Sequence, residues 1–188
     1  MTGDWLATFK EWQAVLSGHF ILTSGLHSDT YFQMALVFQY PHRGAEVARA
    51  LARRLGELQP DVVIGPATGG ILLSYELSRI LGGRSIFAER QEGAMTLRRG
   101  FSLREGERVL VCEDVITTGG SVKEVVNLVR ERKADVVGIA AIVERGQAQF
   151  EMPVTSLVKV SVRSFAPETC PLCAAGSDAV KPGSRGLK

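Results

Sequence analysis

The sequence predicts a single α/β domain in which helices cover a central, mainly parallel sheet. Short, continuous apolar runs, such as Val109–Cys112 and Val136–Val143, alternate along the chain with amphipathic helical segments. Strands that are apolar throughout are typical of parallel sheets that are buried on both faces. The chain has 188 residues, 45% of them hydrophobic, which is enough for one domain with a core of its own.

The composition also argues against several classes of protein. The apolar runs are far shorter than the roughly 20 residues that cross a bilayer, and the start of the sequence lacks a basic segment followed by an apolar one. We therefore expect a cytoplasmic protein without a membrane partner. A net charge of +2 is too small to indicate a nucleic-acid partner. Three cysteines are too few for a disulfide framework, so reduced thiols are expected.

The first part of the chain, residues 1–40, predicts a helix and two short strands. Asp4 caps a helix whose apolar residues return every three or four positions as far as Leu16. Phe20–Leu22 and Tyr31–Phe32 then read as strands joined by a polar loop.

The remaining elements follow in a regular alternation. Pro41 opens a helix that is expected to reach about Leu58. Residues 61–162 form the core. Its expected strands are Asp61–Ile64, Ser85–Ala88, Val109–Cys112, Val136–Val143 and Val154–Val160, and its expected helices are Ile71–Leu81 and Ser121–Lys133. The apolar pattern then fades, so residues 163–188 are expected to form a surface tail.

One strand–turn–helix segment, Val109–Ser121, carries the strongest chemical signal. The strand is followed by the carboxylates Glu113 and Asp114, and a turn rich in hydroxyls and glycines then leads into a helix. The N-terminus of a helix at the carboxyl end of a parallel strand binds anions, which suits a phosphate. The carboxylates repel a phosphate, so they need sugar hydroxyls, a metal ion or an arginine. Together they indicate a sugar phosphate, although helix capping by the carboxylates alone remains an alternative.

This segment resembles the signature of the type I phosphoribosyltransferases, which bind 5-phosphoribosyl 1-diphosphate. The resemblance implies that Glu113 and Asp114 hold the ribose hydroxyls and act in catalysis, with Mg²⁺ bound to the substrate diphosphate. It also implies that the 5-phosphate is held by the segment that follows, which consists of Val115, Ile116, Thr117, Thr118, Gly119, Gly120 and Ser121.

A second glycine turn, Gly65–Gly70, follows the Asp61–Ile64 strand. Standing alone, it is equally compatible with an ordinary helix-capping turn. The resemblance implies that it binds the diphosphate through Thr68 and Gly69. Some orotate-specific members carry a lysine in this turn, and its absence here leaves backbone amides, magnesium or residues from elsewhere to make the contacts.

The polar segment Glu89–Glu107 is too long for an ordinary connection and is expected to be a mobile loop or a hairpin. The resemblance implies a catalytic loop that closes over the diphosphate, often from the neighbouring subunit of a homodimer. Arg90 is the best placed of its basic residues to bind an anion and is expected to act in catalysis. Arg98 and Arg99 are weaker candidates, and Arg104 is expected to be a surface charge.

The acceptor base is indicated by two softer matches. Gly18–Phe32 resembles the hood of orotate phosphoribosyltransferases, which implies that Ser24, Tyr31 and Phe32 cover a pyrimidine. Arg145, at the end of a strand, is implied to bind the orotate carboxylate together with Thr117. The resemblance thus implies formation of orotidine 5-monophosphate in pyrimidine biosynthesis. Two alternatives stay open: a different base (a purine, xanthine or uracil) and a regulator that senses phosphoribosyl diphosphate without catalysis.

The sequence pattern assigns no firm role to the cysteines and histidines. Cys170 and Cys173 have half of a zinc-site spacing, but the third cysteine, Cys112, falls inside a predicted strand. Ordinary thiols are therefore favoured over a metal shared across a dimer or redox chemistry, and a closed four-ligand site within one chain is not expected. His27 is a candidate for substrate binding. His19 and His42 are expected on the surface.

Overall fold

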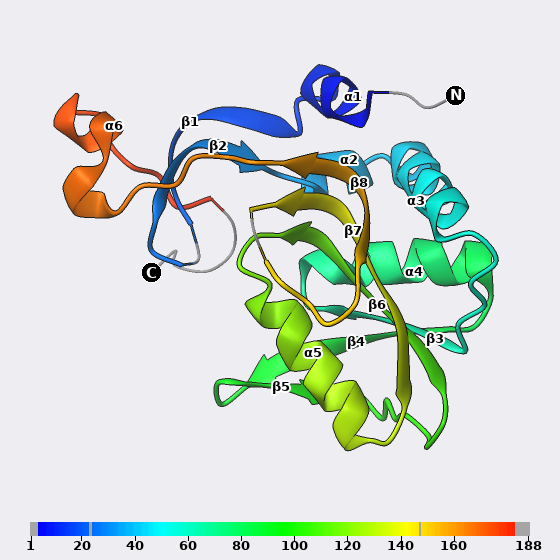
Figure 1. The fold of residues 1–188 in the computed structure, drawn as a ribbon. Helices are drawn as coiled ribbons and strands as arrows, with labels where there is room; N and C mark the ends of the chain where they lie inside the picture. The colour runs from blue at the N-terminus through cyan, green and yellow to red at the C-terminus, as the bar shows by residue number, and fades with distance from the viewer. Residues whose placement is uncertain (1–3, 23, 147, 183–188) are drawn as a thin grey trace. The chain divides into compact units, whose positions relative to one another are not determined.

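The computed structural model describes residues 4–22, 24–146 and 148–182 (Figure 1). The chain divides into two compact units. One consists of Met34–Val160 and is called the sheet unit below. The other combines Met1–Gln33 with Ser161–Lys188 and is called the hairpin unit.

The sheet unit is built on six strands in the order β5-β4-β3-β6-β7-β8. All neighbouring strands are parallel except β4 and β5, which are antiparallel. The α/β fold class predicted from the sequence is confirmed. The strands are β3 (Val62–Pro66), β4 (Arg84–Gln91), β5 (Ala94–Leu97), β6 (Arg108–Ile116), β7 (Asp135–Arg145) and β8 (Val154–Val160).

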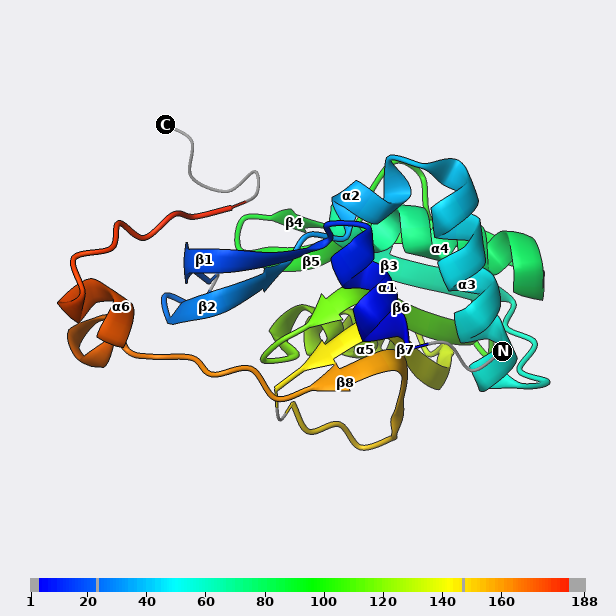
Figure 2. The same ribbon diagram turned by 90° about the horizontal axis from the view of Figure 1, so that it is seen from above.

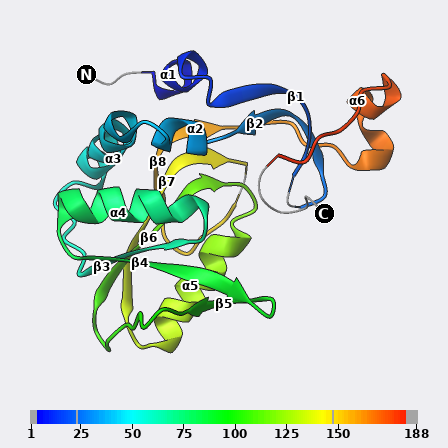
Figure 3. The same cartoon turned by 180° about the vertical axis from the view of Figure 1, so that it is seen from behind.

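Helices cover both faces of this sheet. They are α2 (Ala35–Phe38), α3 (Pro41–Leu55), α4 (Gly69–Leu81) and α5 (Gly120–Glu131). Figures 1 and 3 show α3 and α4 along one face and α5 along the other. Right-handed crossovers require this arrangement, because β3–α4–β4 and β6–α5–β7 proceed in opposite directions across the sheet.

Strands β3 and β6 therefore lie at the point where the strand order reverses. They are adjacent and parallel, with Ile64 paired to Val111. The turns that follow them emerge at the same edge of the sheet and diverge to opposite faces. Ligands of open α/β sheets bind at such a switch point, because diverging connections leave a crevice there.

Most apolar residues of the predicted strands are buried in the core of the sheet unit, as expected. Val62, Ile64, Val109, Val111 and Ile139 are buried in one cluster with residues from α5. The strand ends differ from the prediction. β6 continues through Glu113 and Asp114 to Ile116, because it keeps pairing with β7 as far as Glu144.

The hairpin unit contains α1 (Trp5–Glu11), β1 (Val15–Ile21) and β2 (His27–Phe32). Asp4 caps α1 as predicted, accepting hydrogen bonds from the backbone N–H groups of Leu6 and Ala7. The helix is shorter than predicted, because Gln13 has a φ of 57° and the chain is extended from Val15 onward. The predicted strands exist and pair as an antiparallel hairpin.

The segment expected to be a surface tail is tied to this hairpin. It contains a 3-10 turn, η1 (Pro167–Thr169), and the short helix α6 (Pro171–Ala174). The backbone of His27 exchanges hydrogen bonds of 2.8 and 2.9 Å with Phe165, and the Val180 N–H donates to the His19 carbonyl at 2.8 Å. Figure 2 shows α6, in orange, beside the end of the blue β1–β2 hairpin, which belongs to the same unit. Within the described ranges, no helix is both long and apolar enough to span a membrane.

Candidate active site

The turn after β6 connects a buried strand to α5 through Thr117, Thr118 and Gly119. It is shorter than predicted, because Val115 and Ile116 belong to the strand and Ile116 is buried. Both threonines are exposed. This leaves their hydroxyls and the first N–H groups of α5 at the edge of the sheet.

Gly119 is required by the shape of this turn. Its φ of 78° is left-handed, and a Cβ built on it would lie 2.7 Å from the Phe150 ring. As the N-cap of α5 it offers no side chain to cap the helix. The N–H groups of the first turn of α5 have no carbonyl partner within the helix, so they are suited to an anion.

The turn after β3 is made differently. Ala67 and Thr68 follow the strand, the peptide bond between them is cis, and Gly69 begins α4. The Thr68 side chain is exposed and makes no capping hydrogen bond to α4. This turn therefore presents mainly backbone to a ligand.

Asp114 joins the two turns. It lies on β6, yet a Cβ built on Gly69 would be only 2.4–2.5 Å from its carboxylate atoms. The carboxylate thus lies against the backbone at the start of α4, and any side chain at Gly69 would displace it. This contact confirms that two turns distant in sequence meet at one place.

Hydrogen bonds and burial set the state of this carboxylate. The Val115 N–H donates to Asp114 Oδ1 at 2.7 Å, and the Asp114 N–H donates to Glu113 Oε1 at 3.2 Å. Burial nevertheless raises the pKa of Asp114, against the lowering effect of hydrogen bonds to its carboxyl group from the Glu113 side chain and from the backbone N–H groups of Val115 and Asp114. Without a ligand, the ionised form of this carboxylate is therefore unfavourable in free energy. Hydrogen bonds from sugar hydroxyls or contact with a cation would stabilise it.

Arg145 lies at the same edge of the sheet, as predicted. It is the last residue of β7, and its side chain is 5% exposed. Ile116 pairs with Glu144 in the neighbouring strand, which brings Arg145 level with Thr117. A Cβ built on Gly146 would lie 3.2 Å from the Thr117 carbonyl oxygen, so the turn after β6 and the end of β7 are in close contact.

Arg90 is placed differently from the prediction. It lies within β4, which extends to Gln91, and pairs with Met95 of β5. Its guanidinium donates to Glu124 Oε1 on α5 at 2.8 Å and to the Gly93 carbonyl. Arg90 therefore reaches the first turns of α5, where it is held by an ion pair that the sequence pattern did not reveal.

The hairpin alternative for Glu89–Glu107 is confirmed by β4 and β5. Glu92 and Gly93 form its tip, and Met95 and Leu103 anchor it in the core of the sheet unit. Arg99 donates to Glu89 at 2.8 and 2.9 Å, which lowers the pKa of Glu89. The side chains of Arg98 and Arg104 are exposed.

The predicted hood residues belong to the hairpin unit. Ser24 is exposed, Tyr31 is half-buried with its ring 5.6 Å from that of Phe20, and Phe32 is 5% exposed. Their contact with a base remains a prediction.

The prediction that His19 is a surface residue is wrong, because its side chain is 5% exposed. It lies with His27, Cys170 and Cys173 in one cluster, which the cysteine spacing alone did not predict.

His42 is exposed, as predicted. Cys112 is buried in β6 as predicted, and burial raises its pKa well above the ordinary value.

Comparison with known proteins decides the family. The model of the family described as "Phosphoribosyl transferase domain" matches residues 37–165. The chain belongs to the phosphoribosyltransferase family. This confirms the resemblance that Val109–Ser121 suggested, and it identifies the chain as a transferase enzyme.

Relatives of this phosphoribosyltransferase match it over nearly their full length. It is 53% identical over 188 residues to the orotate phosphoribosyltransferase of Pelotomaculum thermopropionicum, covering 98% of this chain and 99% of the relative. It is 52% identical over 182 residues to that of Thermoanaerobacter sp. (strain X514), covering 96% of each. The crystal structure of orotate phosphoribosyltransferase from Aeropyrum pernix is similar with a TM-score of 0.71 at 25% identity, covering 82% of this chain and 92% of that one.

Proposed function

We propose that this phosphoribosyltransferase transfers the phosphoribosyl group of 5-phosphoribosyl 1-diphosphate to orotate, giving orotidine 5-monophosphate and diphosphate. The observation that carries the donor assignment is the position of Asp114, whose carboxylate reaches from β6 to the turn after β3. A donor with a phosphate at each end and hydroxyls between them matches two anion-binding turns with a carboxylate between them. The orotate phosphoribosyltransferases among the relatives support the acceptor.

Each part of the donor has a matching group on the chain. The 5-phosphate accepts hydrogen bonds from the first N–H groups of α5 and from the hydroxyls of Thr117, Thr118 and Ser121. Glu113 and Asp114 accept hydrogen bonds from the ribose hydroxyls, which are strong because the acceptor is charged. The diphosphate lies at the turn after β3, where Thr68 and Gly69 offer backbone groups.

Magnesium fits this arrangement. The turn Gly65–Gly70 has no basic side chain, so the charge of a diphosphate there needs a cation from another source. Carboxylate and phosphate oxygens are the ligands that Mg²⁺ prefers, and Asp114 supplies a carboxylate at this turn. When bound with the diphosphate, Mg²⁺ neutralises the negative charge that develops on the leaving group.

The acceptor lies on the side of β7. The Arg145 guanidinium binds the orotate carboxylate, since this charge distinguishes orotate from other pyrimidines. Thr117, level with Arg145, contacts the base from the turn after β6. Contact of Ser24, Tyr31 and Phe32 with the base ring stays a prediction of the hood resemblance. Arg90 and the β4–β5 hairpin help to exclude water from the opposite side, which protects the sugar cation from hydrolysis.

The chain contributes to the reaction mainly by positioning and electrostatics. The bond between C1 of the ribose and the diphosphate oxygen breaks, and its electron pair leaves with the diphosphate. The orotate ring nitrogen, having lost its proton, forms the new bond from the opposite face. Glu113 and Asp114 hold the ribose and oppose the positive charge that develops on it. We expect a cytoplasmic homodimer that acts in pyrimidine biosynthesis.

A panel of bases tests this proposal. The purified enzyme is mixed with phosphoribosyl diphosphate and Mg²⁺, and turnover is followed with orotate, adenine, guanine, xanthine, hypoxanthine and uracil. We expect saturable turnover with orotate alone. Turnover of another base would support the assignment of the donor but contradict orotate as the acceptor. Tight binding of the donor without any turnover would overturn catalysis in favour of a sensor.

A matched pair of arginine variants locates the acceptor site. Arg145→Ala should raise the KM for orotate by about 10- to 150-fold, because a hydrogen-bonded charge pair contributes about 1.5–3 kcal/mol. The KM for the donor should stay nearly unchanged. Arg104→Ala removes an exposed arginine of the β5–β6 connection and should change neither constant. Equal effects of the two variants would exclude Arg145 as the group that binds orotate.

A further inference from the structure

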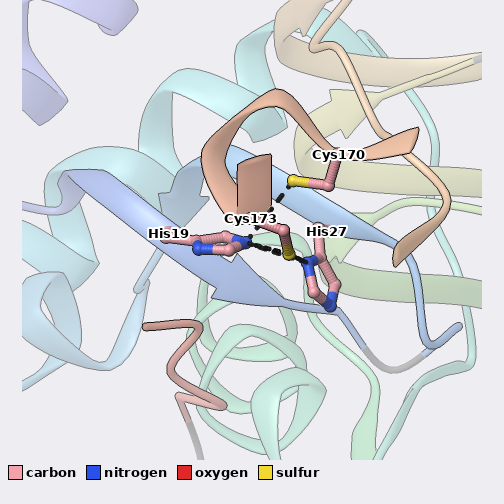
Figure 4. Close-up of side chains that lie close together, drawn as sticks. All are labelled: His19, His27, Cys170 and Cys173. Atoms are coloured by element: carbon pink, nitrogen blue, oxygen red, sulfur yellow. Dashed lines mark hydrogen bonds between the residues drawn. The ribbon is translucent and has the colours of Figure 1, made fainter. Parts of the chain in front are cut away.

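Four side chains with metal-binding atoms converge in the hairpin unit (Figure 4). His19 comes from β1, and His27 begins β2. Cys170 is the N-cap of α6, and Cys173 lies within this helix. One ligand atom from each lies within 4.8 Å of all the others. The cluster takes no part in the proposed transfer reaction.

The hairpin explains how the two histidines meet. Ile21 pairs with His27, and His19 lies two residues before Ile21 on β1. Since side chains alternate along a strand, both imidazoles project from the same face. The β1–β2 register shifts between Ser17 and Phe20, so a local bulge adjoins His19. Bulges of this kind re-aim side chains and are common next to functional sites.

The spacing of the ligand atoms matches a tetrahedral site. Cys170 Sγ lies 3.5 Å from His19 Nε2, and Cys173 Sγ lies 3.7 Å from His19 Nε2 and 3.3 Å from His27 Nδ1. In a zinc site with Zn–N of about 2.0–2.1 Å and Zn–S of about 2.3 Å, neighbouring N and S atoms lie about 3.5 Å apart. His19 Nε2 and His27 Nδ1 are 2.8 Å apart, so they need to separate by about half an ångström.

A backbone contact orients one of the imidazoles. His19 Nδ1 lies 2.9 Å from the Ser177 carbonyl oxygen, and a carbonyl can only accept, so Nδ1 carries the proton. The lone pair of His19 is therefore on Nε2, the atom that faces the cluster. Metal-binding histidines almost always make such a contact through their other nitrogen.

Burial and charge also favour a metal site at this cluster. His19 is 5% exposed, His27 7% and Cys170 3%, while Cys173 lies at the surface. Two thiolates balance the charge of one divalent cation, so two neutral imidazoles complete a site without net charge. In the described segment 161–182, Cys170 is the one hydrophobic side chain that is buried. The C-terminal segment therefore needs an anchor other than an apolar core.

The geometry points to a structural zinc site formed by His19, His27, Cys170 and Cys173 within one chain. Its role is to fasten the C-terminal segment to the β1–β2 hairpin. Two histidines and two cysteines in tetrahedral array favour Zn²⁺ over the harder Mg²⁺. The site closes with four protein ligands and has no open position for a substrate. It is thus independent of the proposed reaction.

Metal content tests the site without any activity assay. The full chain is purified reduced and without a histidine tag, incubated with Zn²⁺, desalted and analysed by elemental mass spectrometry. We expect about one zinc ion per chain, since a closed four-ligand site binds tightly. Less than about a tenth of an ion per chain would overturn the site. About half an ion per chain would overturn a ligand set from one chain in favour of a shared ion.

Two matched pairs of variants assign the ligands. Cys173→Ser and His19→Ala should lose the zinc, whereas Cys112→Ala and His42→Ala, which lie outside the cluster, should keep it. Retention of stoichiometric zinc by Cys173→Ser would contradict the assignment. Co²⁺ bound to the unaltered chain keeps the test independent of variants that fail to fold. It should show the absorption of tetrahedral cobalt with thiolate ligands, and a spectrum without thiolate charge transfer would overturn the site.

Thiol reactivity gives a third readout. With zinc bound, Cys170 and Cys173 should react slowly with an alkylating reagent, and a chelator should expose both. Equal rates with and without the chelator would contradict the proposal.

Discussion

The turns after β3 and β6 are neighbours at the switch point, but they present different chemistry. The turn after β6 follows two carboxylates and displays the exposed hydroxyls of Thr117 and Thr118. The turn after β3 displays an exposed Thr68 and otherwise backbone, with Gly69 packed against Asp114. Both begin a helix without a side-chain cap.

Because of this difference, the two turns should respond to opposite kinds of mutation. The turn after β6 acts through side chains, so removing atoms from it should impair the enzyme. The turn after β3 acts through close approach of its backbone, so adding atoms to it should be harmful.

The largest effect is expected from removing both negative charges of β6. Glu113→Gln combined with Asp114→Asn keeps the shapes but weakens two charge-assisted hydrogen bonds to the ribose. We expect kcat/KM to fall by about 10²- to 10⁴-fold, at about 1.5–3 kcal/mol per bond. Steady-state kinetics with saturating Mg²⁺ measures this. A loss of less than tenfold would separate these carboxylates from the reaction.

The second prediction adds one methyl group to the turn after β3. A Cβ at Gly69 would lie 2.4 Å from Asp114 Oδ2, so Gly69→Ala must displace that carboxylate. We expect kcat/KM to fall by about 100-fold, the scale of a 1 Å misplacement, and the fold to lose about 1–3 kcal/mol.

A double-mutant cycle identifies the cause of that loss. In the Asp114→Ala background the added methyl has room, so Gly69→Ala should destabilise the fold less than it does in the unaltered chain. Urea unfolding measures both differences. If the cost is the same in the two backgrounds, the clash lies elsewhere.

A matched pair of threonines gives the third prediction. Thr118→Ala removes a hydroxyl from the turn after β6 and should raise the KM for the donor by about 2- to 10-fold, as expected for one hydrogen bond. Thr68→Ala removes one from the turn after β3 and should change this KM by less than about twofold, since that turn acts through its backbone. A larger effect at Thr68 would reverse the contrast.

The smallest effect concerns stability and pH. Burial raises the pKa of Asp114 above its unfolded value, so its contribution to stability is fully present below the unfolded pKa and is lost as the pH rises through the folded pKa. Without ligands, Asp114→Asn should therefore raise the Tm at pH 8. Near pH 4 the gain should shrink. Thermal unfolding across this range checks the trend, and a gain that grows toward acid pH would contradict it.

The alternation of apolar strands and helices made the sheet unit predictable. Continuous runs such as Val109–Cys112 and Val136–Val143 have one stable solution, a sheet covered on both faces. The carboxylates and glycine turns could be placed at one edge for the same reason, because parallel strands end there. The extension of β6 to Ile116 was missed, since polar residues at a strand end carry no apolar signal.

Contacts between segments that are distant in the sequence could not be predicted from the sequence pattern. The Arg90–Glu124 pair and the packing of Gly69 on Asp114 depend on the strand order, which periodicity does not reveal. The same holds for His19 and Cys170, which are separated by most of the chain. A search for Cys-x-x-Cys together with unassigned histidines would have found the cluster as a hypothesis.

The position of the 5-phosphate distinguishes the two turns. A crystal structure of the enzyme with orotidine 5-monophosphate would show which turn holds it. We predict that the phosphate binds the first N–H groups of α5 and the Thr118 hydroxyl, with Glu113 and Asp114 on the ribose hydroxyls. A phosphate bound at Thr68 and Gly69, with no ligand atoms at the turn after β6, would contradict this assignment of the two turns.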